Sequence, residues 1–278
     1  MPVLRVGHSP DADDAFMFYP LAKGIITVPG YEITHVLEEI QALNQRALKG
    51  ELEVTAISAA VYPQVAQHYR IMPCGASVGR KYGPAVVSKK PLDARDLAGK
   101  RIAIPGQFTT AYMLLRIYMS KPFEPVFMSF DAVTEAVQQG KVDAGIFIHE
   151  GQIREREMGL HKVLDLGRWW FDDTGLPVPL GLDMVHRRLG DRLGRQVTRA
   201  LHDAIVHSRT HEDDALDYAL AFGRGIDRET GRKFVRMYVN QDTEDMGEDG
   251  RKALETLFAR AAKKGIIKEA PPLDLVEI

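Results

Sequence analysis

Residues 101–119 read Arg-Ile-Ala-Ile-Pro-Gly-Gln-Phe-Thr-Thr-Ala-Tyr-Met-Leu-Leu-Arg-Ile-Tyr-Met, and this stretch decides the fold class. The apolar run at its start predicts a strand over 101–104. Pro105 and Gly106 predict a loop, and Thr109 is a residue type that commonly begins a helix, here one that runs to about Met119. A strand that leads through a short loop into a helix is typical of an α/β fold with a largely parallel sheet.

The same alternation continues on both sides of this stretch. We expect further strands at 4–6, 31–37, 54–57, 85–88, 126–128, 144–148 and 163–166. We expect helices at 13–22, 40–49, 59–69 and 130–139, and only helices from about residue 193 to residue 267. The pattern predicts two α/β lobes around a central cleft, followed by a helical C-terminal tail.

Two breaks in the pattern predict where the chain crosses between the lobes. Residues 89–91 are polar and end in a proline, and residues 177–181 (Pro-Val-Pro-Leu-Gly) have the composition of an extended linker. We therefore expect residues 1–89 and 182–278 to form the first lobe and residues 90–181 to form the second.

Composition excludes several classes of protein. The 278 residues are 45% hydrophobic and 27% charged, which excludes disorder as the main organisation. Thirty-six Lys and Arg against 38 Asp and Glu give a net charge of −2, which argues against a nucleic-acid partner. The single cysteine, Cys74, excludes an internal disulfide framework and a multi-cysteine zinc site. No run approaches the ~18 apolar residues of a membrane span, and residues 1–8 do not read as a signal peptide, so we expect a cytoplasmic protein without a membrane partner.

Four strand-to-helix junctions carry candidate ligand-binding residues, because ligands of open α/β sheets bind at the carboxyl ends of the strands. The first junction, 7–19, has aspartates at positions 11, 13 and 14, which could cap the next helix or bind a cation. The second, 55–60, consists of small residues around Ser58, which is either a helix cap or a donor to a ligand.

The other two junctions follow the strands at 101–104 and 144–148. At the first of these, the helix that begins near Thr109 and Thr110 is either an ordinary capped helix or an anion site. A carboxylate is a better candidate there than a nucleotide, because the loop lacks the Lys-Ser/Thr pair of a phosphate-binding loop. At the second, His149 directly follows the strand, where it is either structural or a group for proton transfer near neutral pH.

Taken together, the chain resembles the 1,4-dihydroxy-6-naphthoate synthase family of the futalosine route to menaquinone. The segments that carry the resemblance are 9–18 (Ser-Pro-Asp-Ala-Asp-Asp-Ala-Phe-Met-Phe), 109–112 (Thr-Thr-Ala-Tyr), 148–150 (Ile-His-Glu), 175–181 and 238–240. The resemblance implies a periplasmic-binding-protein-like fold of type II. It also implies a cytoplasmic carbon–carbon lyase that converts cyclic dehypoxanthinyl futalosine into 1,4-dihydroxy-6-naphthoate, releases dihydroxyacetone, and needs no cofactor or metal.

The resemblance also assigns site residues. His149 matches the catalytic base of the family. The substrate-binding matches are Ala56, Ile57, Ser58, Thr109, Thr110, Ala111, Ser9 and Asp14, of which Ala56 offers only its backbone. The roles of Asp11 and Asp13, and the oligomeric state, stay open.

Three alternatives share the expected fold, because a fold does not fix a function. The first is a cytoplasmic protein that binds a small anion or another solute without turnover. The second is chorismate dehydratase, the sister enzyme of the same route, although residues 9–18 resemble the naphthoate synthases instead. The third is a synthase of a thiamine precursor, whose cysteine-rich iron motif a single cysteine cannot supply.

Overall fold

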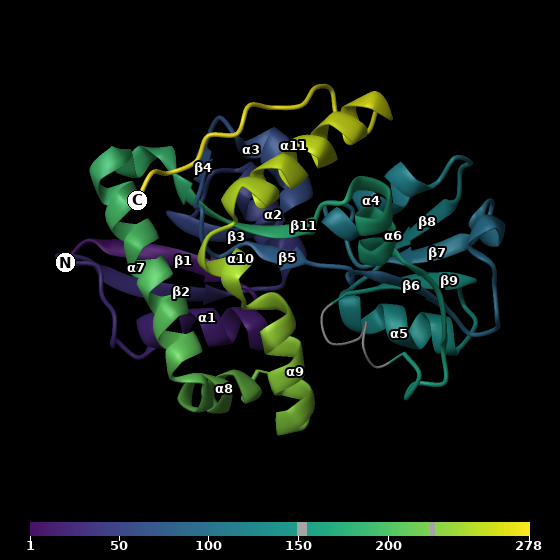
Figure 1. Ribbon diagram of the computed structural model, residues 1–278, viewed down its shortest axis with the longest axis horizontal. Helices are drawn as coiled ribbons and strands as arrows, with labels where there is room; N and C mark the ends of the chain where they lie inside the picture. Colours follow the sequence, from purple (N-terminus) through teal and green to yellow (C-terminus); the bar gives the residue numbers. More distant parts are fainter. Residues whose placement is uncertain (149–154, 223–225) are drawn as a thin grey trace. The chain divides into compact units, whose positions relative to one another are not determined.

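A computed structural model describes residues 1–148, 155–222 and 226–278 (Figure 1). By their internal contacts these residues form two compact units. The first unit comprises Met1–Val78, Pro179–Glu255 and Pro271–Ile278, and the second comprises Gly79–Val178 and Thr256–Ala270. Each unit contains its own β-sheet.

The sheet of the first unit has the strand order β2-β1-β3-β11-β4. The strands are β1 (Val3–His8), β2 (Glu32–Leu37), β3 (Val54–Ser58), β4 (Tyr69–Ile71) and β11 (Val178–His186), and β5 (Ser77–Gly79) also pairs with β11. β1 is parallel to both β2 and β3, whereas β11 is antiparallel to β3 and to β4. The junctions that follow β1 and β3 therefore leave the sheet at the same edge.

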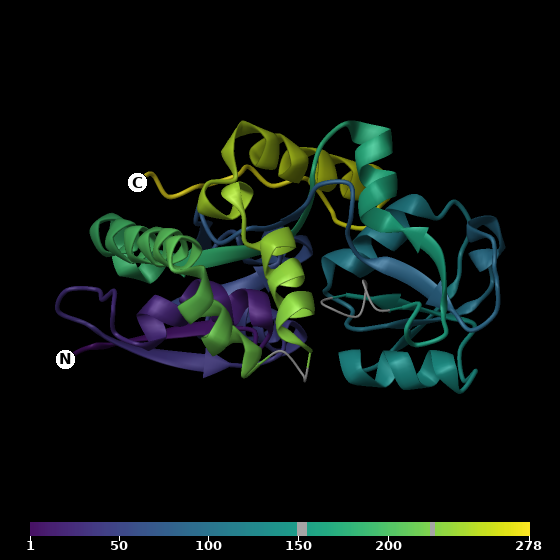
Figure 2. The same cartoon turned by 60° about the horizontal axis from the view of Figure 1, so that its bottom comes forward.

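Helices cover this first sheet. They are α1 (Ala12–Ala22), α2 (Ile40–Leu48), η1 (Ala59–Val61), α3 (Tyr62–Val65), η4 (Arg187–Leu189), α7 (Gly190–Thr210), α8 (Glu212–Leu220), α9 (Arg228–Tyr238) and α10 (Gln241–Glu244). α11 (Gly247–Lys263) is divided between the two units. α1 packs against α7, α8 and α9, which lie beside it in both views (Figures 1 and 2). Phe16 and Phe18 of α1 are fully buried, and each such side chain stabilises the fold by roughly 1.5–3 kcal/mol.

Residues 271–278 run along the free edge of β4. Leu275 forms a parallel bridge with Ile71, and the Val276 N–H donates to the Ile71 carbonyl over 2.9 Å. The Tyr62 hydroxyl donates to the Pro272 carbonyl over 3.0 Å. This segment therefore extends the first sheet by one short strand.

The sheet of the second unit has the strand order β10-β6-β9-β7-β8. The strands are β6 (Ala85–Ser88), β7 (Arg101–Ile104), β8 (Glu124–Phe127), β9 (Ala144–Phe147) and β10 (His161–Asp165). The helices are η2 (Ala94–Leu97), α4 (Thr110–Tyr118), α5 (Phe130–Gln138) and α6 (Leu166–Thr174). β7 is parallel to β8 and β9, and β6 is antiparallel to β9 and β10. Trp170 of α6 is fully buried, and its indole N–H donates to the Pro177 carbonyl over 2.9 Å.

Most of the predicted elements are confirmed, and three predictions need correction. The linker expected at 177–181 is wrong, because residues 178–181 belong to β11, a strand of nine residues. Pro179 and Gly181 favour a loop when the segment is considered in isolation. The helix expected over 59–69 ends at Val65, and Tyr69 instead enters the sheet as part of β4. β6 pairs with β9 and β10, so residues 85–88 belong to the second sheet and not to the lobe 1–89 in which the sequence placed them.

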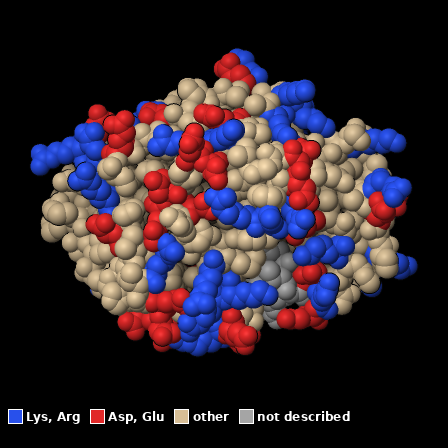
Figure 3. Space-filling model, viewed as in Figure 1, with Lys and Arg blue, Asp and Glu red and all other residues tan. Residues whose placement is uncertain are grey.

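Charged side chains of both signs alternate over the face shown in Figure 3. On α9, Arg228 and Arg232 form ion pairs with Asp213, and Arg236 pairs with Glu212 of α8. On these two helices, positive and negative side chains thus neutralise each other as local ion pairs. Among the helices of the described residues, none combines the length and the apolar character that crossing a bilayer requires.

Candidate active site

The junction after β1 is built around Ser9, which is buried. The Ser9 N–H donates to Oδ2 of Asp14 over 2.6 Å, and the Ser9 hydroxyl donates to Oδ2 of Asp11. Asp11 is the N-cap residue of α1, but its side chain makes no capping hydrogen bond. Both hydrogen-bond donors of Ser9, the N–H and the hydroxyl, are therefore used within the loop. Toward a ligand, the Ser9 hydroxyl oxygen can act as an acceptor.

Asp14 lies in the first turn of α1. Burial raises the pKa of its carboxyl well above the usual value, and the nearby carboxyls of Asp183 and Asp11 raise it further. The hydrogen bond from the Ser9 N–H opposes this shift because it stabilises the ionised form. Asp14 therefore holds a proton more readily than a surface aspartate.

Ser58 ends β3 at the same sheet edge and is held by Asn44 of α2. The Ser58 N–H donates to Oδ1 of Asn44 over 2.8 Å, and Nδ2 of Asn44 donates to the Ser58 hydroxyl oxygen over 3.0 Å. Because the hydroxyl oxygen accepts from Asn44, the Ser58 O–H is directed to act as a donor elsewhere. Ala56 and Ile57 are buried in the strand before it.

Asn44 was not among the residues that we predicted for the site. The sequence does contain a signal, since Asn44 stands between Leu43 and Ala47 on the buried side of an amphipathic helix. A fully buried amide needs hydrogen-bond partners, and here the partner is a predicted site residue.

His8, the last residue of β1, forms a buried pair with His35 of β2. The His8 ring stacks on Phe18 with centroids 4.2 Å apart, and its Nε2 lies 2.9 Å from Nδ1 of His35. Nδ1 of His8 lies 3.2 Å from the Ser9 carbonyl, which can only accept, so Nδ1 carries the proton and Nε2 accepts from His35. Burial lowers the pKa of His8 to about 3, so the ring is neutral. It contacts the Ser9 loop through the Ser9 carbonyl.

In the second unit, the junction after β7 leads into α4. Thr109 is the N-cap residue: its hydroxyl accepts from the Tyr112 N–H over 3.3 Å and donates to the Gly106 carbonyl over 2.9 Å. The capping interpretation of Thr109 is thus confirmed. Thr110 and Ala111 form the first turn of α4, and the N-terminus of a helix favours anions.

β9 ends beside β7 in the same sheet. The register pairs Ile102 with Ala144 and Ala103 with Gly145 in parallel, so the chain leaves β9 at the edge where α4 begins. His149 and Glu150 follow this strand but lie outside the described residues. The structure therefore places the strand that precedes His149 and does not test its role.

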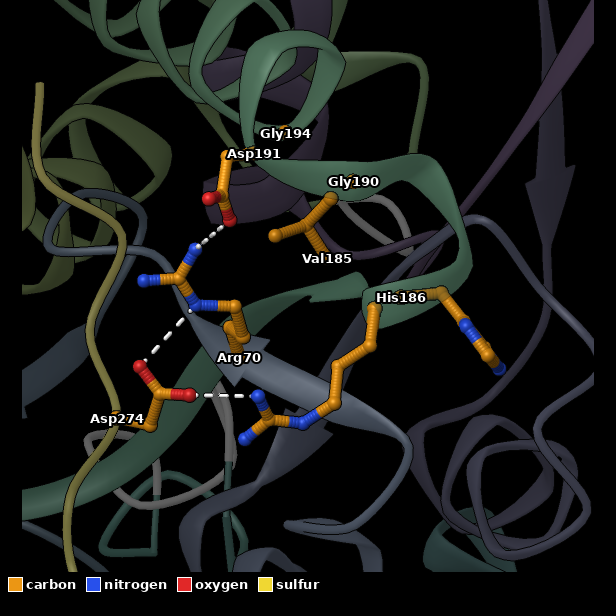
Figure 4. Close-up of a pocket in the computed structure, with 8 residues that line it drawn as sticks. Arg70, Val185, His186, Gly190, Asp191, Gly194 and Asp274 are labelled. Atoms are coloured by element: carbon orange, nitrogen blue, oxygen red, sulfur yellow. Dashed lines mark hydrogen bonds and ion pairs between the residues drawn. The ribbon is translucent and has the colours of Figure 1, made fainter.

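A pocket of about 250 Å³ lies at the opposite end of the first sheet, beside the first residues of β3 (Figure 4). Its charged groups pair with one another: Arg70 contacts Asp191 and Asp274, each over 3.1 Å, and Arg187 contacts Asp274 over 2.6 Å. These pairs hold residues 271–278 against β4. The pocket is separate from the junctions after β1 and β3 and contains none of the predicted site residues.

Comparison with known proteins identifies the family. A family model described as menaquinone biosynthesis matches residues 4–263. The chain belongs to the menaquinone biosynthesis family. A relative from Thermus thermophilus named 1,4-dihydroxy-6-naphthoate synthase is 40% identical over 98% of this chain and 98% of its own. The family resemblance drawn from the sequence motifs is therefore confirmed.

Solved structures show the same fold. A crystal structure of an Archaeoglobus fulgidus protein is 46% identical, with a TM-score of 0.91 over 95% of this chain and 98% of that one. A Candida albicans protein described as having the generic periplasmic binding protein fold is 11% identical, with a TM-score of 0.70 over 100% of this chain and 98% of that one. At that identity the likeness concerns the fold alone, and it confirms the predicted fold class.

Proposed function

We propose that this chain is a 1,4-dihydroxy-6-naphthoate synthase, a carbon–carbon lyase that acts on cyclic dehypoxanthinyl futalosine and releases dihydroxyacetone. The observation that carries the proposal is the name of the Thermus thermophilus relative, together with 40% identity over 98% of both chains. The segment 9–18, with its buried Ser9 and half-buried Asp14, supports the same assignment. The cytoplasm as the site of action stays a prediction.

The mechanism assigns the proton transfer to His149. In the proposed reaction, its neutral imidazole removes a proton that a neighbouring carbonyl group has made acidic. The carbon–carbon bond then breaks, the sugar-derived fragment leaves, and the remaining ring becomes aromatic. No redox partner enters this sequence of steps.

The other site residues bind and orient the substrate. In the first unit, the Ser58 O–H donates to an oxygen of the substrate, and Asn44 fixes the direction of that hydroxyl. In the second unit, Thr110 and Ala111 lie at the N-terminus of α4, whose helix dipole favours a negatively charged group, such as the carboxylate of a naphthoate. Holding reacting groups in a defined geometry lowers the barrier by the entropy that is lost on binding.

The test is turnover by the purified protein. Cyclic dehypoxanthinyl futalosine is supplied without added cofactor, and the naphthoate product is followed by absorbance and mass. His149→Ala should lower kcat by about 10²–10⁴-fold with a smaller change in substrate binding, as expected for loss of a general base. His161→Ala, which replaces an exposed histidine at the start of β10, is the matched control and should leave kcat unchanged.

Two results would contradict the proposal. An unchanged kcat in His149→Ala would remove this residue from the role of base. Binding of the substrate by the wild type without product would favour a solute-binding protein or the sister enzyme, and chorismate would then be the next compound tested.

A further inference from the structure

His35 of β2 is a half-buried polar residue that the proposed mechanism does not use. Its Nδ1 lies 2.9 Å from Nε2 of His8. Its Nε2 is buried and has no hydrogen-bond partner in the described part of the chain. A buried ring nitrogen without a partner needs an explanation, because most buried polar atoms of folded proteins are hydrogen-bonded.

Two protons serve the four ring nitrogens of this histidine pair. Burial lowers the pKa of both rings, and the Leu21 carbonyl, which favours a proton on His35, does not outweigh it, so each neutral ring carries one proton. The Ser9 carbonyl, 3.2 Å from Nδ1 of His8, can only accept, which places the first proton on that Nδ1. Nε2 of His8 then accepts, which places the second proton on Nδ1 of His35. Nε2 of His35 is left as an acceptor without a donor, in agreement with its missing partner.

Three aromatic rings from three elements pack around this hydrogen bond. The His8 ring of β1 stacks on Phe18 of α1, with centroids 4.2 Å apart and an interplanar angle of 7°. His35 meets both rings edge-on, at 5.1 Å from His8 and 6.2 Å from Phe18. A half-turn of the His8 ring about χ2 would keep the stack and move Nδ1 away from Ser9. The stack therefore fixes the plane of the ring, and the hydrogen bond from His35 helps to fix which edge faces Ser9.

Ser9 stands at the end of this chain of contacts and uses each of its polar groups. Its N–H donates to Asp14, its hydroxyl donates to Asp11, and its carbonyl accepts from His8. The carbonyl contact leads through His8 to the neighbouring strand β2. We propose that His35 is a positioning residue of the proposed active site: by donating to Nε2 of His8 it orients the ring whose Nδ1–H holds the Ser9 carbonyl, and so directs the Ser9 hydroxyl oxygen toward the substrate.

Loss of the donor at position 35 has a defined consequence, which rests on the proposed function because Ser9 binds substrate there. Nε2 of His8 becomes a buried acceptor without a partner, and the ring is free to turn. The Ser9 carbonyl then loses its fixed donor, and the hydroxyl of the same residue loses its direction. Because this contact orients a binding group and takes no part in the proton transfer, its loss should affect KM more than kcat.

The test compares two substitutions of nearly equal size. His35→Asn places an amide N–H near the position of Nδ1 and keeps a donor to His8, whereas His35→Leu has a similar shape without a donor. With cyclic dehypoxanthinyl futalosine, His35→Leu should raise KM about tenfold and change kcat by less than about twofold, the size of effect expected for one hydrogen bond. His35→Asn should keep KM within about threefold of the wild type. His161→Leu, at an exposed position of β10, is the control and should keep the wild-type KM.

A double-mutant cycle tests whether His35 acts through His8. His8→Phe keeps a ring against Phe18 and removes both nitrogens. In that background His35→Leu should no longer raise KM, because the contact through which it acts is absent. The same rise in both backgrounds would overturn the proposal. An unchanged KM in His35→Leu alone, or an equal rise in His35→Asn, would do the same.

A second measurement depends neither on turnover nor on the folding of His35→Leu. In wild-type protein labelled with ¹⁵N at histidine, NMR should find slowly exchanging protons on Nδ1 of His8 and Nδ1 of His35. The His8 proton should stay slow in His35→Asn and exchange fast in His35→Leu. If the wild type makes no product but shows these protons and this response, the proposed function fails and the orientation of His8 by His35 stands. If the His8 proton lies on Nε2, or if its exchange is the same in both variants, the proposal for His35 is wrong even in an active enzyme.

Discussion

Replacing Asp183 by asparagine should make the stability of the protein less dependent on pH. Asp183 is buried in β11, and burial raises the pKa of its carboxyl to about 8 in the folded chain, against an ordinary value of 3.8. Between these two values the folded chain holds a proton that the unfolded chain has released. Folding therefore takes up a proton, and the free energy of unfolding falls as pH rises, by about 1.4 kcal/mol per pH unit, until it levels off above the folded pKa.

Asparagine has no proton to take up, so the comparison isolates this one group. Over three pH units, from pH 5 to pH 8, the variant should gain about 4 kcal/mol on the wild type. At roughly 2–4 °C per kcal/mol for a unit of this size, the difference in Tm should grow by about 8–16 °C. Any effect of the substitution on stability that does not depend on pH shifts the whole curve of unfolding free energy against pH and leaves its slope unchanged.

Thermal unfolding of both proteins in matched buffers at half-unit pH steps measures this slope. Titrating groups that Asp183 does not influence cancel in the difference, because both chains contain them. A difference in Tm that is constant from pH 5 to pH 8 would refute the argument, since it would mean that Asp183 has the same charge in the folded and unfolded chains.

Two further predictions concern other contacts. Asn44→Ala removes both hydrogen bonds to Ser58 and should raise KM about tenfold while costing roughly 1–3 kcal/mol of stability, as steady-state kinetics and denaturant unfolding would measure; an unchanged KM would separate Ser58 from substrate binding. Asp274→Asn weakens the ion pairs to Arg70 and Arg187 and should cost about 1 kcal/mol at pH 7, with no change in KM. Those arginines lower the pKa of Asp274, so its contribution is present above the ordinary carboxyl pKa and is lost as pH falls through the lowered value. A cost for Asp274→Asn that is equally large at acidic pH would show that the charge is not its cause.

The sequence predicted the elements whose local signals agree with their tertiary roles. The strand, loop and helix over 101–119 are an example, since Thr109 caps α4 as its residue type suggests. β11 could not be found in this way, because Pro179 and Gly181 favour a loop and only pairing with β3 and β4 makes a strand of the segment.

The site was predicted to a similar extent. The junctions after β1, β3 and β7 lie at the carboxyl ends of strands, as expected, because strand direction follows from the alternation of strands and helices. Asn44 and His35 escaped prediction, since a polar residue in an apolar segment is informative only when its neighbours in space are known. His149 stays a prediction, because it lies outside the described residues.

The pairing of residues 271–278 with β4 has a consequence for biosynthesis. The first unit needs three separate stretches of chain, and the third of them supplies the strand beside Ile71. While the ribosome is still translating the codons before residue 271, the edge of β4 has no partner, and an open strand edge invites pairing with other chains. Synthesis of the first unit therefore spans almost the entire translation time of residues 1–278, and the edge of β4 stays open until residues 271–278 have been made.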